Sequence, residues 1–403
     1  MIINDLAEKI SAKGGRLYLV GGAVRDLLMN KAPHDYDYCI TGLEIKEFQE
    51  IVPEARIRGK AFPVFDFDGC EYALARQEVK TGVGHKAFEM ISNKEISIED
   101  DLRRRDITIN SIAMNVLTGE IIDPYNGKKD IENKIIRATS EAFVEDPLRT
   151  YRVARFVSEL GFNVDENTIK LMRKTRDELN TLSSERIFVE LDKALKSSKP
   201  SLFFETLKKA DVLDIHFEEI YNLIGVIQPE KYHPEGDAYN HTMQVIDKMA
   251  IKTDISYIVF AGLVHDLGKA LTPLEERPRH IGHEERGVGL TKNLCNRLKL
   301  PTKYVKAGIT ACKDHMKAGI FNEMRVSKKV DFIERLSKAA IGLDGIEILA
   351  NADNTKNTEI RFAEIGKEML EKVNAKEYPK EMDYNIIKEK LRRDRIDWLK
   401  ERV

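Results

Sequence analysis

Two glycines and two aspartates near the N-terminus have residue types and spacing suited to phosphate chemistry. Gly21 and Gly22 follow a short apolar run at residues 17 to 20 and precede a helix-like segment. Glycines between a strand and a helix let backbone N–H groups approach a phosphate closely. Asp35 and Asp37 follow on a predicted second strand, where residues two apart point to the same face. Neighbouring carboxylates repel each other unless a cation neutralises them, so the pair predicts a Mg²⁺ site for phosphoryl-type transfer.

Arginines supply a second part of this predicted site. In DDLRRRDITINSIAMN, residues 100 to 115, three arginines precede Asp106. Their guanidinium groups suit a triphosphate, because each can bind two phosphate oxygens at once. Arg25, in the first turn of the helix after the glycines, adds another positive charge. The competing interpretations are a basic solvated loop here and, for Asp35 and Asp37, a solvated turn without a metal.

The segment EDPLRTYRVARF, residues 145 to 156, predicts a means of reading a base. Asp146 and Arg149 are three residues apart and share a face of the expected helix. The carboxylate accepts hydrogen bonds and the guanidinium donates them, which suits the Watson–Crick edge of C or A. An ion pair on a helix surface is the alternative interpretation.

A second set of potential metal ligands lies in the later half of the chain. Six of the nine histidines fall between residues 233 and 315. They include His241 on an amphipathic segment and His265, which Asp266 follows directly, and Asp353 adds a further carboxylate. Clustered imidazoles and carboxylates suit Mn²⁺, Co²⁺ or Ni²⁺ better than Mg²⁺. Histidines satisfied within an apolar core are the alternative interpretation.

Composition limits the class of protein. Of the 403 residues, 42% are hydrophobic and 33% are charged, which excludes a disordered chain. The net charge of -2 means that RNA binding would need a local basic face. The four cysteines show no C-x-x-C spacing, so we expect neither a zinc ribbon nor a disulfide framework. Without a signal peptide or an apolar run of about 18 residues, the sequence predicts a cytoplasmic protein that does not span a membrane.

The motifs of the first 190 residues resemble those of a known family. GGAVRD…DYD, RRRDITIN, DPYNGKKDI, EDPLR and SERIFVE occur in the order and spacing of bacterial class II tRNA nucleotidyltransferases. These CCA-adding enzymes belong to the same superfamily as bacterial poly(A) polymerases. The resemblance implies that Asp35 and Asp37 hold catalytic Mg²⁺ and that residues 77 to 90 form a flexible loop that helps the switch from C to A. It also implies a nucleotide-binding set made of Gly21, Gly22, Arg25, Arg105, Asp106, Asp146, Arg149, Arg152 and Arg155.

The later histidines resemble those of the HD phosphohydrolase superfamily. HPEGDAYNHTM, HDLGKALTP and PRHIGHEERGVG are similar to the C-terminal half of the multifunctional branch of CCA-adding enzymes, which carries phosphatase and 2′,3′-cyclic phosphodiesterase activity. The resemblance implies the metal ligands His241, His265, Asp266 and Asp353. His283 and His315 are candidates for a phosphate contact or a second metal. A decayed HD scaffold with a purely structural role is the alternative.

Together these features predict an α+β head with a mixed sheet and helices, followed by an all-α neck, body and HD domain. The predicted parts are a nucleotidyltransferase head (1–138), a helical neck and body (139–224), an HD domain (225–335) and a helical tail (336–403).

The leading hypothesis is an enzyme that adds C, C and A to the 3′ end of tRNA from CTP and ATP, contacting the acceptor arm, with a second HD activity. The alternatives are a poly(A) polymerase, a CC- or A-adding specialist, and an HD phosphohydrolase whose first half only binds RNA. The sequence gives no oligomeric state.

Overall fold

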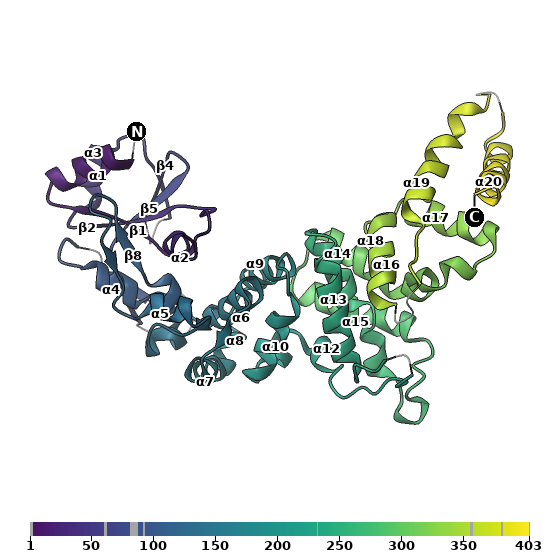
Figure 1. The fold of residues 1–403 in the computed structure, drawn as a ribbon, viewed down its shortest axis with the longest axis horizontal. Helices are drawn as coiled ribbons and strands as arrows, with labels where there is room; N and C mark the ends of the chain where they lie inside the picture. Colours follow the sequence, from purple (N-terminus) through teal and green to yellow (C-terminus); the bar gives the residue numbers. More distant parts are fainter. Residues whose placement is uncertain are drawn as a thin grey trace. The chain divides into compact units, whose positions relative to one another are not determined.

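The computed structural model describes residues 3–59, 63–80, 88–91, 93–231, 233–354, 358–379 and 382–402 (Figure 1). Contacts between residues divide the chain into two compact units, which are treated separately below. Unit 1 contains residues 1–186 and 205–212, and unit 2 contains residues 187–204 and 213–403. The division into four parts made from the sequence stays a prediction.

A mixed sheet of seven strands forms the centre of unit 1. Its order is β3 (Arg56–Arg58), β4 (Val64–Phe67), β5 (Cys70–Leu74), β2 (Asp37–Thr41), β1 (Arg16–Val20), β8 (Ala113–Asn115) and β9 (Ile121–Ile122). All neighbouring strands are antiparallel except β2 and β5, which run parallel. The predicted α+β head with a mixed sheet is therefore confirmed.

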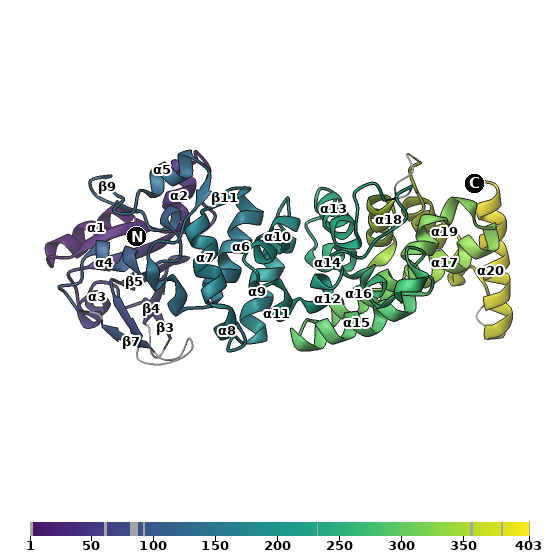
Figure 2. The same ribbon diagram turned by 90° about the horizontal axis from the view of Figure 1, so that it is seen from below.

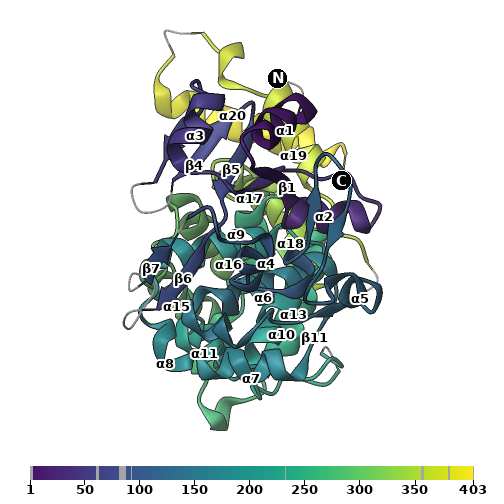
Figure 3. The same ribbon diagram turned by 90° about the vertical axis from the view of Figure 1, so that its left-hand side faces the viewer.

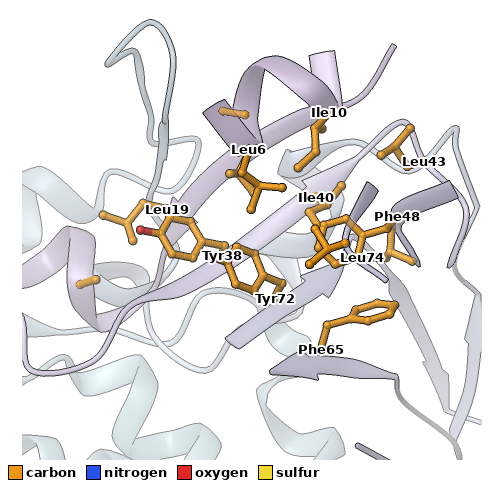
Figure 4. Close-up of a cluster of buried hydrophobic side chains, with 14 of the residues drawn as sticks. Leu6, Ile10, Leu19, Tyr38, Ile40, Leu43, Phe48, Phe65, Tyr72 and Leu74 are labelled. Carbon is orange, nitrogen blue, oxygen red and sulfur yellow. The ribbon is translucent and has the colours of Figure 1, made fainter. Parts of the chain in front are cut away.

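Helices cover both faces of this sheet, which explains why the side chains of β1 are buried from Leu17 to Val20. Successive side chains of a strand point to opposite faces. Leu19 packs with Leu6 and Ile10 of α1 (Ile3–Ala12), as Figure 4 shows. Val20 packs on the other face, in a cluster that includes Leu102 of α4 (Ile98–Arg103). Figure 3 shows α1 and α3 (Ile45–Ile51) beside the strands of the head.

The remaining elements of unit 1 are mostly short helices. They are α2 (Gly22–Leu28), α5 (Gly127–Glu132), α6 (Leu148–Leu160), α7 (Glu166–Lys174) and α8 (Arg176–Leu179), with the two-residue strands β10 (Ile135–Ile136) and β11 (Asn163–Val164). Helices α9 (Ser184–Leu195) and α10 (Ser201–Lys209) each contribute residues to both units.

Unit 2 consists of helices, as predicted. They are α11 (Leu213–His216), α12 (Glu218–Tyr221), α13 (Ala238–Ala250), α14 (Ser256–Val264), α15 (His283–Arg297), α16 (Thr302–Gly319), α17 (Val326–Leu336), α18 (Gly342–Asp353), α19 (Ala363–Lys372) and α20 (Tyr384–Lys400). Helix α14 is apolar on all sides because α13, α16 and α18 pack around it. Helices α17, α19 and α20 pack together near the C-terminus (Figure 2).

Three local expectations need correction or restriction. Strand β2 begins at Asp37, so Asp35 lies in the bend before the strand rather than on it. Helix α6 begins at Leu148, so Asp146 precedes the helix that carries Arg149. In the predicted loop 77–90, β6 (Gln77–Lys80) and β7 (Phe88–Ile91) form an antiparallel pair, and residues 81–87 lie outside the described residues.

None of the described helices combines the length and the apolar composition needed to cross a lipid bilayer.

Candidate functional sites

A cavity of about 400 Å³ in unit 1 brings together all nine residues predicted to bind a nucleotide. Its lining consists of Gly21, Gly22, Arg25, Asp37, Arg104, Arg105, Asp106, Asn110, Asp146, Arg149, Arg152, Arg155, Phe156 and Glu159. Five of the six arginines in this set had been predicted from the sequence, and Arg104 had not. Guanidinium groups outnumber carboxylates on the wall, which suits a polyanionic ligand.

The glycine turn lets a guanidinium approach the backbone at the edge of this cavity. Gly21 adopts a positive φ of 71°, a conformation that L side chains rarely accept. A Cβ atom on Gly21 would lie 3.1 Å from Nη1 of Arg105. Glycine at this position therefore allows the turn into α2 and also leaves space for the Arg105 guanidinium.

A buried carboxylate fixes two of the cavity arginines. Asp101, which is 1% exposed, accepts hydrogen bonds from Nη2 of Arg104 at 2.6 Å and from Nη2 of Arg105 at 3.0 Å. Burial alone would raise the pKa of Asp101, but the two guanidinium groups lower it below its ordinary value. The ionised Asp101 carboxylate therefore holds the side chains of Arg104 and Arg105 in position at the cavity.

Asp106 is held at the cavity by its own arginine. Nε of Arg152 donates to Asp106 at 2.7 Å, and the amide of Ile107 donates to the other carboxylate oxygen at 2.9 Å. Burial favours a raised pKa for Asp106, but Arg152 outweighs it and the pKa is lowered. Arg155 pairs with Glu159 at 2.7 Å, and its guanidinium lies over the ring of Phe156.

Asp146 and Arg149 line the cavity without pairing with each other. Asp146 accepts hydrogen bonds from Arg186 at 3.0 Å and from the Leu148 amide at 3.1 Å. Arg149 donates to two backbone carbonyls, those of Ala142 at 2.7 Å and Arg104 at 2.6 Å. The helix-surface ion pair that competed with base reading is therefore not what the structure contains. Each group is instead oriented by its own partners.

A neighbouring acidic hollow contains both predicted metal-binding aspartates. Asp35 and Asp37 line it together with Asp66 and Glu71. The Asp35 side chain is 86% exposed and does not line the arginine-rich cavity, whereas Asp37 lines both. Burial raises the pKa of Asp37, Arg105 opposes this rise and Asp35 adds to it. A cation bound between the carboxylates would relieve this repulsion.

Glu71 also lines the acidic hollow, and the sequence analysis did not predict it as a site residue. It lies directly beside Asp37, because β2 and β5 run parallel with these two residues in register. The segment VFDFDGCEYALAR forms a hairpin of β4 and β5 that turns at Asp68 and Gly69. The hairpin predicts which residues alternate along β5, but only the pairing with β2 shows that Glu71 joins the aspartates.

In unit 2, the four predicted ligands converge on one point. Nε2 of His241 lies 2.9 Å from Oδ1 of Asp353 and 3.8 Å from Oδ2 of Asp266. Nε2 of His265 lies 3.2 Å from Oδ2 of Asp266 and 3.7 Å from Oδ1 of Asp353. Three helices supply them: α13 carries His241, α14 ends just before His265, and α18 ends at Asp353.

The second oxygen of Asp266 faces another pair of histidines. Nε2 of His283 lies 3.2 Å from Oδ1 of Asp266, and Nε2 of His315 lies 3.5 Å from the same atom. Gly268 permits this arrangement, because a Cβ atom there would lie 1.9 Å from the carbonyl oxygen of His283. Asp266 therefore stands between two groups of imidazoles, and both candidate histidines from the sequence lie at the site.

Hydrogen bonds on the outer nitrogens set the orientation of all four rings. Nδ1 of His241 faces Glu235 at 2.6 Å, and Nδ1 of His265 faces the Gly262 carbonyl at 2.7 Å. The Nδ1 atoms of His283 and His315 face the carbonyls of His280 and Ala311 at 2.8 and 2.9 Å. An oxygen acceptor at Nδ1 requires the proton there, which leaves the Nε2 lone pair of a neutral ring directed at the centre.

The centre therefore contains acceptor atoms that need a positive charge. Among the described residues, neither carboxylate oxygen of Asp266 nor Nε2 of His265 has a hydrogen bond of acceptable geometry. Burial lowers the pKa of His265, but Asp266 outweighs this effect and raises it to about 10. These groups fit a divalent cation, whose ligands are neutral imidazoles and ionised carboxylates.

Lys269 is a charged neighbour that the sequence reading did not single out. Its ammonium group lies 2.5 Å from Oδ2 of Asp266 and donates to Gln228 at 2.6 Å. The HDLGK motif places it three residues after Asp266, one helical turn away, and this spacing was the available signal. A buried ammonium here adds positive charge beside the carboxylates.

Comparisons with protein families agree with this two-part organisation. The family model described as "Poly A polymerase head domain" matches residues 17–137, and the "HD domain" model matches residues 238–336. Between them, "Probable RNA and SrmB- binding site of polymerase A" matches residues 161–223. A nucleotidyltransferase head followed by an HD domain defines the class of this protein, and both kinds of domain are generally metal-dependent.

Curated relatives identify the family. The chain is 41% identical to the multifunctional CCA protein of Shewanella frigidimarina over 79% of this chain and 78% of that protein. It is 38% identical to that of Acinetobacter baylyi over 96% and 97%. The chain therefore belongs to the family of multifunctional CCA proteins.

Solved structures share the fold. A CCA-adding enzyme in complex with ATP matches with a TM-score of 0.67 at 20% identity, over 99% of this chain and 90% of that one. The Thermotoga maritima CCA-adding enzyme complexed with tRNA matches with a TM-score of 0.67 at 20% identity, over 100% and 91%. At this level of identity the likeness shows the fold alone.

Proposed function

We propose that the chain adds C, C and A to the 3′ end of tRNA without a nucleic-acid template, using CTP and ATP and releasing pyrophosphate. The observation that carries the proposal is the cavity in unit 1, where arginines, a base-reading pair and Asp37 of the acidic hollow share one wall. Family membership supports it, as do the curated relatives named multifunctional CCA protein. ATP, CTP and tRNA are each named in complexes of solved CCA-adding enzymes with the same fold.

In this proposal the acidic hollow holds Mg²⁺ through Asp35 and Asp37, with Glu71 beside them. When bound, the metal supplies activation of the tRNA 3′-hydroxyl and charge neutralisation at the departing pyrophosphate. The chain's own groups position the nucleotide: Gly21, Gly22, Arg25 and Arg105 receive the triphosphate, and Asp106 meets the ribose. Arg152 holds Asp106 in place, and Arg155 supports the wall beside Phe156.

Base choice is assigned to Asp146 and Arg149. The carboxylate accepts from the exocyclic amino group of C or A, and the guanidinium donates to a ring nitrogen. Because Arg186 and two backbone carbonyls already orient these groups, they are presented to the base in fixed positions. Uracil and guanine present a carbonyl where C and A have an amino group, and an unpaired buried acceptor makes such a mismatch unfavourable.

Asp146→Ala is expected to reduce discrimination between CTP and UTP by about 10- to 100-fold, the size of losing one specific polar contact. The loss should appear mainly in the ratio of kcat/KM values for the two nucleotides. Competition assays with both nucleotides and a transcript that lacks CCA would measure it. Glu159→Ala, which changes a carboxylate of the same cavity that pairs with Arg155 rather than with Asp146 or Arg149, serves as the matched control. An unchanged CTP to UTP ratio in Asp146→Ala would contradict the assignment.

Asp101→Ala is expected to lower kcat/KM for CTP by up to about 100-fold, because displacing groups by about 1 Å near the reacting atoms has effects of this size. The reason is the loss of the anion that fixes Arg104 and Arg105. Steady-state kinetics with increasing CTP would measure the change. Glu99→Ala on the same helix α4 removes an exposed carboxylate and should leave kcat/KM unchanged. Equal kinetics for both variants would show that Asp101 does not position the arginines.

We further propose that the HD site hydrolyses phosphate esters, as a metal-dependent phosphatase and 2′,3′-cyclic phosphodiesterase. His241, His265, Asp266 and Asp353 would hold Mn²⁺, Ni²⁺, Co²⁺ or Mg²⁺. His283 and His315 would hold a second ion or contact the phosphate, and their position around Oδ1 of Asp266 supports either role. The bound metal would polarise a phosphoryl oxygen and lower the pKa of a bound water.

The tRNA acceptor arm is the proposed macromolecular partner. Short A-form RNA is recognised by shape and backbone contacts more than by base sequence. A chain with net charge -2 needs local basic residues for these contacts, so KM for tRNA should rise with salt. All four cysteines are unpaired, which supports the expectation of a reducing, cytoplasmic location.

The proposal is tested with three tRNA transcripts that end before CCA, after the first C and after CC. Each is incubated with CTP, ATP or both in the presence of Mg²⁺, and the 3′ ends are sequenced. Full CCA addition predicts C, C and A in order and then arrest. Repeated addition of A would favour a poly(A) polymerase. Arrest after CC would favour a CC-adding specialist, and addition of A only to the transcript that already ends in CC would favour an A-adding specialist. If no nucleotide is added to any transcript, the remaining hypothesis is an HD phosphohydrolase whose first half only binds RNA.

A further inference from the structure

Glu235 contacts the HD cluster from outside, and no role has been assigned to it so far. It lies in the loop before α13, its side chain is 8% exposed, and one carboxylate oxygen faces two imidazoles. Oε1 is 2.6 Å from Nδ1 of His241 and 3.0 Å from Nδ1 of His233. The rings of His233 and His241 are also in edge-to-face contact, with centroids 4.6 Å apart.

Both ring nitrogens of His241 face carboxylates, so a metal at the proposed centre would place the ring proton on Nδ1. An imidazole has two nitrogens, and Nε2 of His241 faces the carboxylates of Asp353 and Asp266. A distance of 2.6 Å between a ring nitrogen and a carboxylate oxygen is that of a charge-assisted hydrogen bond. Glu235 therefore accepts from Nδ1 and leaves the Nε2 lone pair for the centre. It orients a ligand and is not itself directed at the metal position.

Glu235 differs from the partners of the other three cluster histidines. His265, His283 and His315 each face a backbone carbonyl with Nδ1. Nδ1 of His283 also lies 3.6 Å from a carboxylate oxygen of Glu284, which is beyond hydrogen-bond distance. Within the described chain, only His241 among these four has a carboxylate within hydrogen-bond distance of Nδ1, and such a partner strengthens the opposite nitrogen as a metal ligand.

We propose that Glu235 is a positioning residue of the HD metal site, which fixes His241 as a strong Nε2 ligand, while His233 holds the Glu235 carboxylate in place. This inference rests on the proposed metal site in unit 2. It predicts a carboxylate–histidine–metal arrangement at this one ligand. Loss of such an outer partner weakens metal binding by about 10- to 100-fold.

The test measures Ni²⁺ binding to the full chain by competition with a chromophoric chelator. Glu235→Ala should weaken Ni²⁺ binding by about 10- to 100-fold. Glu235→Gln should lie between this variant and the wild type, because an amide oxygen still accepts the hydrogen bond but carries no charge. Glu230→Gln, which changes an exposed glutamate in the same loop, should bind Ni²⁺ as the wild type does. Unchanged C addition by each variant would show that the chain has folded.

A double-mutant cycle shows whether Glu235 acts through His241. In the His241→Ala background, Glu235→Ala should add no further loss of Ni²⁺ affinity, because the ligand that it orients is gone. If Glu235→Ala weakened Ni²⁺ binding in the His241→Ala background as much as it does in the wild type, the inference would be overturned. Wild-type Ni²⁺ affinity in the single variant Glu235→Ala would overturn it as well. A wild-type chain that binds no Ni²⁺, Mn²⁺ or Co²⁺ would instead defeat the proposed metal site itself, which separates the two failures.

Discussion

Replacing Asp35 and Asp37 together with alanine should slow addition of the first C by about 10³- to 10⁵-fold, the range that follows loss of a transition-state charge stabiliser in phosphoryl transfer. The two carboxylates line the hollow next to the nucleotide cavity, and Asp37 reaches both. Without them the site keeps its arginines but loses the two carboxylates proposed to hold the metal. Binding of CTP should therefore weaken much less than the rate of transfer.

Single-turnover incorporation of labelled CTP into a transcript without CCA would measure this effect. Raising Mg²⁺ should not restore the rate, because the ligands themselves are missing. Glu54→Ala removes an exposed carboxylate from the same unit and should add C at the wild-type rate. If the double variant adds C within about tenfold of the wild-type rate, the metal-binding role of Asp35 and Asp37 is wrong.

Asp266→Asn should abolish hydrolysis in the HD site and reduce metal affinity by more than the 10- to 100-fold typical of an outer partner. Asn has nearly the same shape, so the change tests charge rather than packing. Oδ2 of Asp266 faces His265 at 3.2 Å, and Oδ1 faces His283 at 3.2 Å. One substitution therefore removes an anionic ligand from both groups of imidazoles.

Equilibrium dialysis with Ni²⁺ and Mn²⁺, followed by metal analysis, would measure the loss of affinity. Hydrolysis of a 2′,3′-cyclic nucleotide would measure the loss of activity. Asp254→Asn changes an exposed aspartate just before α14 and should bind metal normally. Retention of metal and hydrolysis by Asp266→Asn would contradict the ligand role of Asp266. A wild-type chain that neither binds metal nor hydrolyses the cyclic nucleotide would instead mean that the HD cluster is a structural scaffold, the alternative left open by the sequence.

Sequence patterns predicted the head and the helical remainder because the required signals are local. A short apolar run ending in Gly21 and Gly22 encodes a strand, a turn and a helix within a few residues. The apolar segment before His265 likewise encodes a buried helix, α14, that ends at the cluster of histidines and aspartates. The four HD ligands were chosen by resemblance, and the structure brings all four together.

The groups missed in the sequence depend on contacts between distant segments. Glu71 joins the aspartates only through its register with Asp37 across β2 and β5. Asp101 is one acid among several in its segment until its burial beneath two arginines is known. Asp146 pairs with Arg186, forty residues away, rather than with the nearby Arg149. Local spacing identifies which residues can react, whereas tertiary packing decides which partners orient them.

The most direct test of two independent metal sites is one side-by-side assay of both reactions. Wild type, Asp35→Ala/Asp37→Ala and Asp266→Asn are each given a transcript without CCA, CTP, ATP and Mg²⁺, and separately a 2′,3′-cyclic nucleotide with Ni²⁺. The wild type should add C, C and A and hydrolyse the cyclic phosphate. The first variant should lose only addition, and the second should lose only hydrolysis. Loss of both reactions in either variant, or of neither, would contradict the assignment.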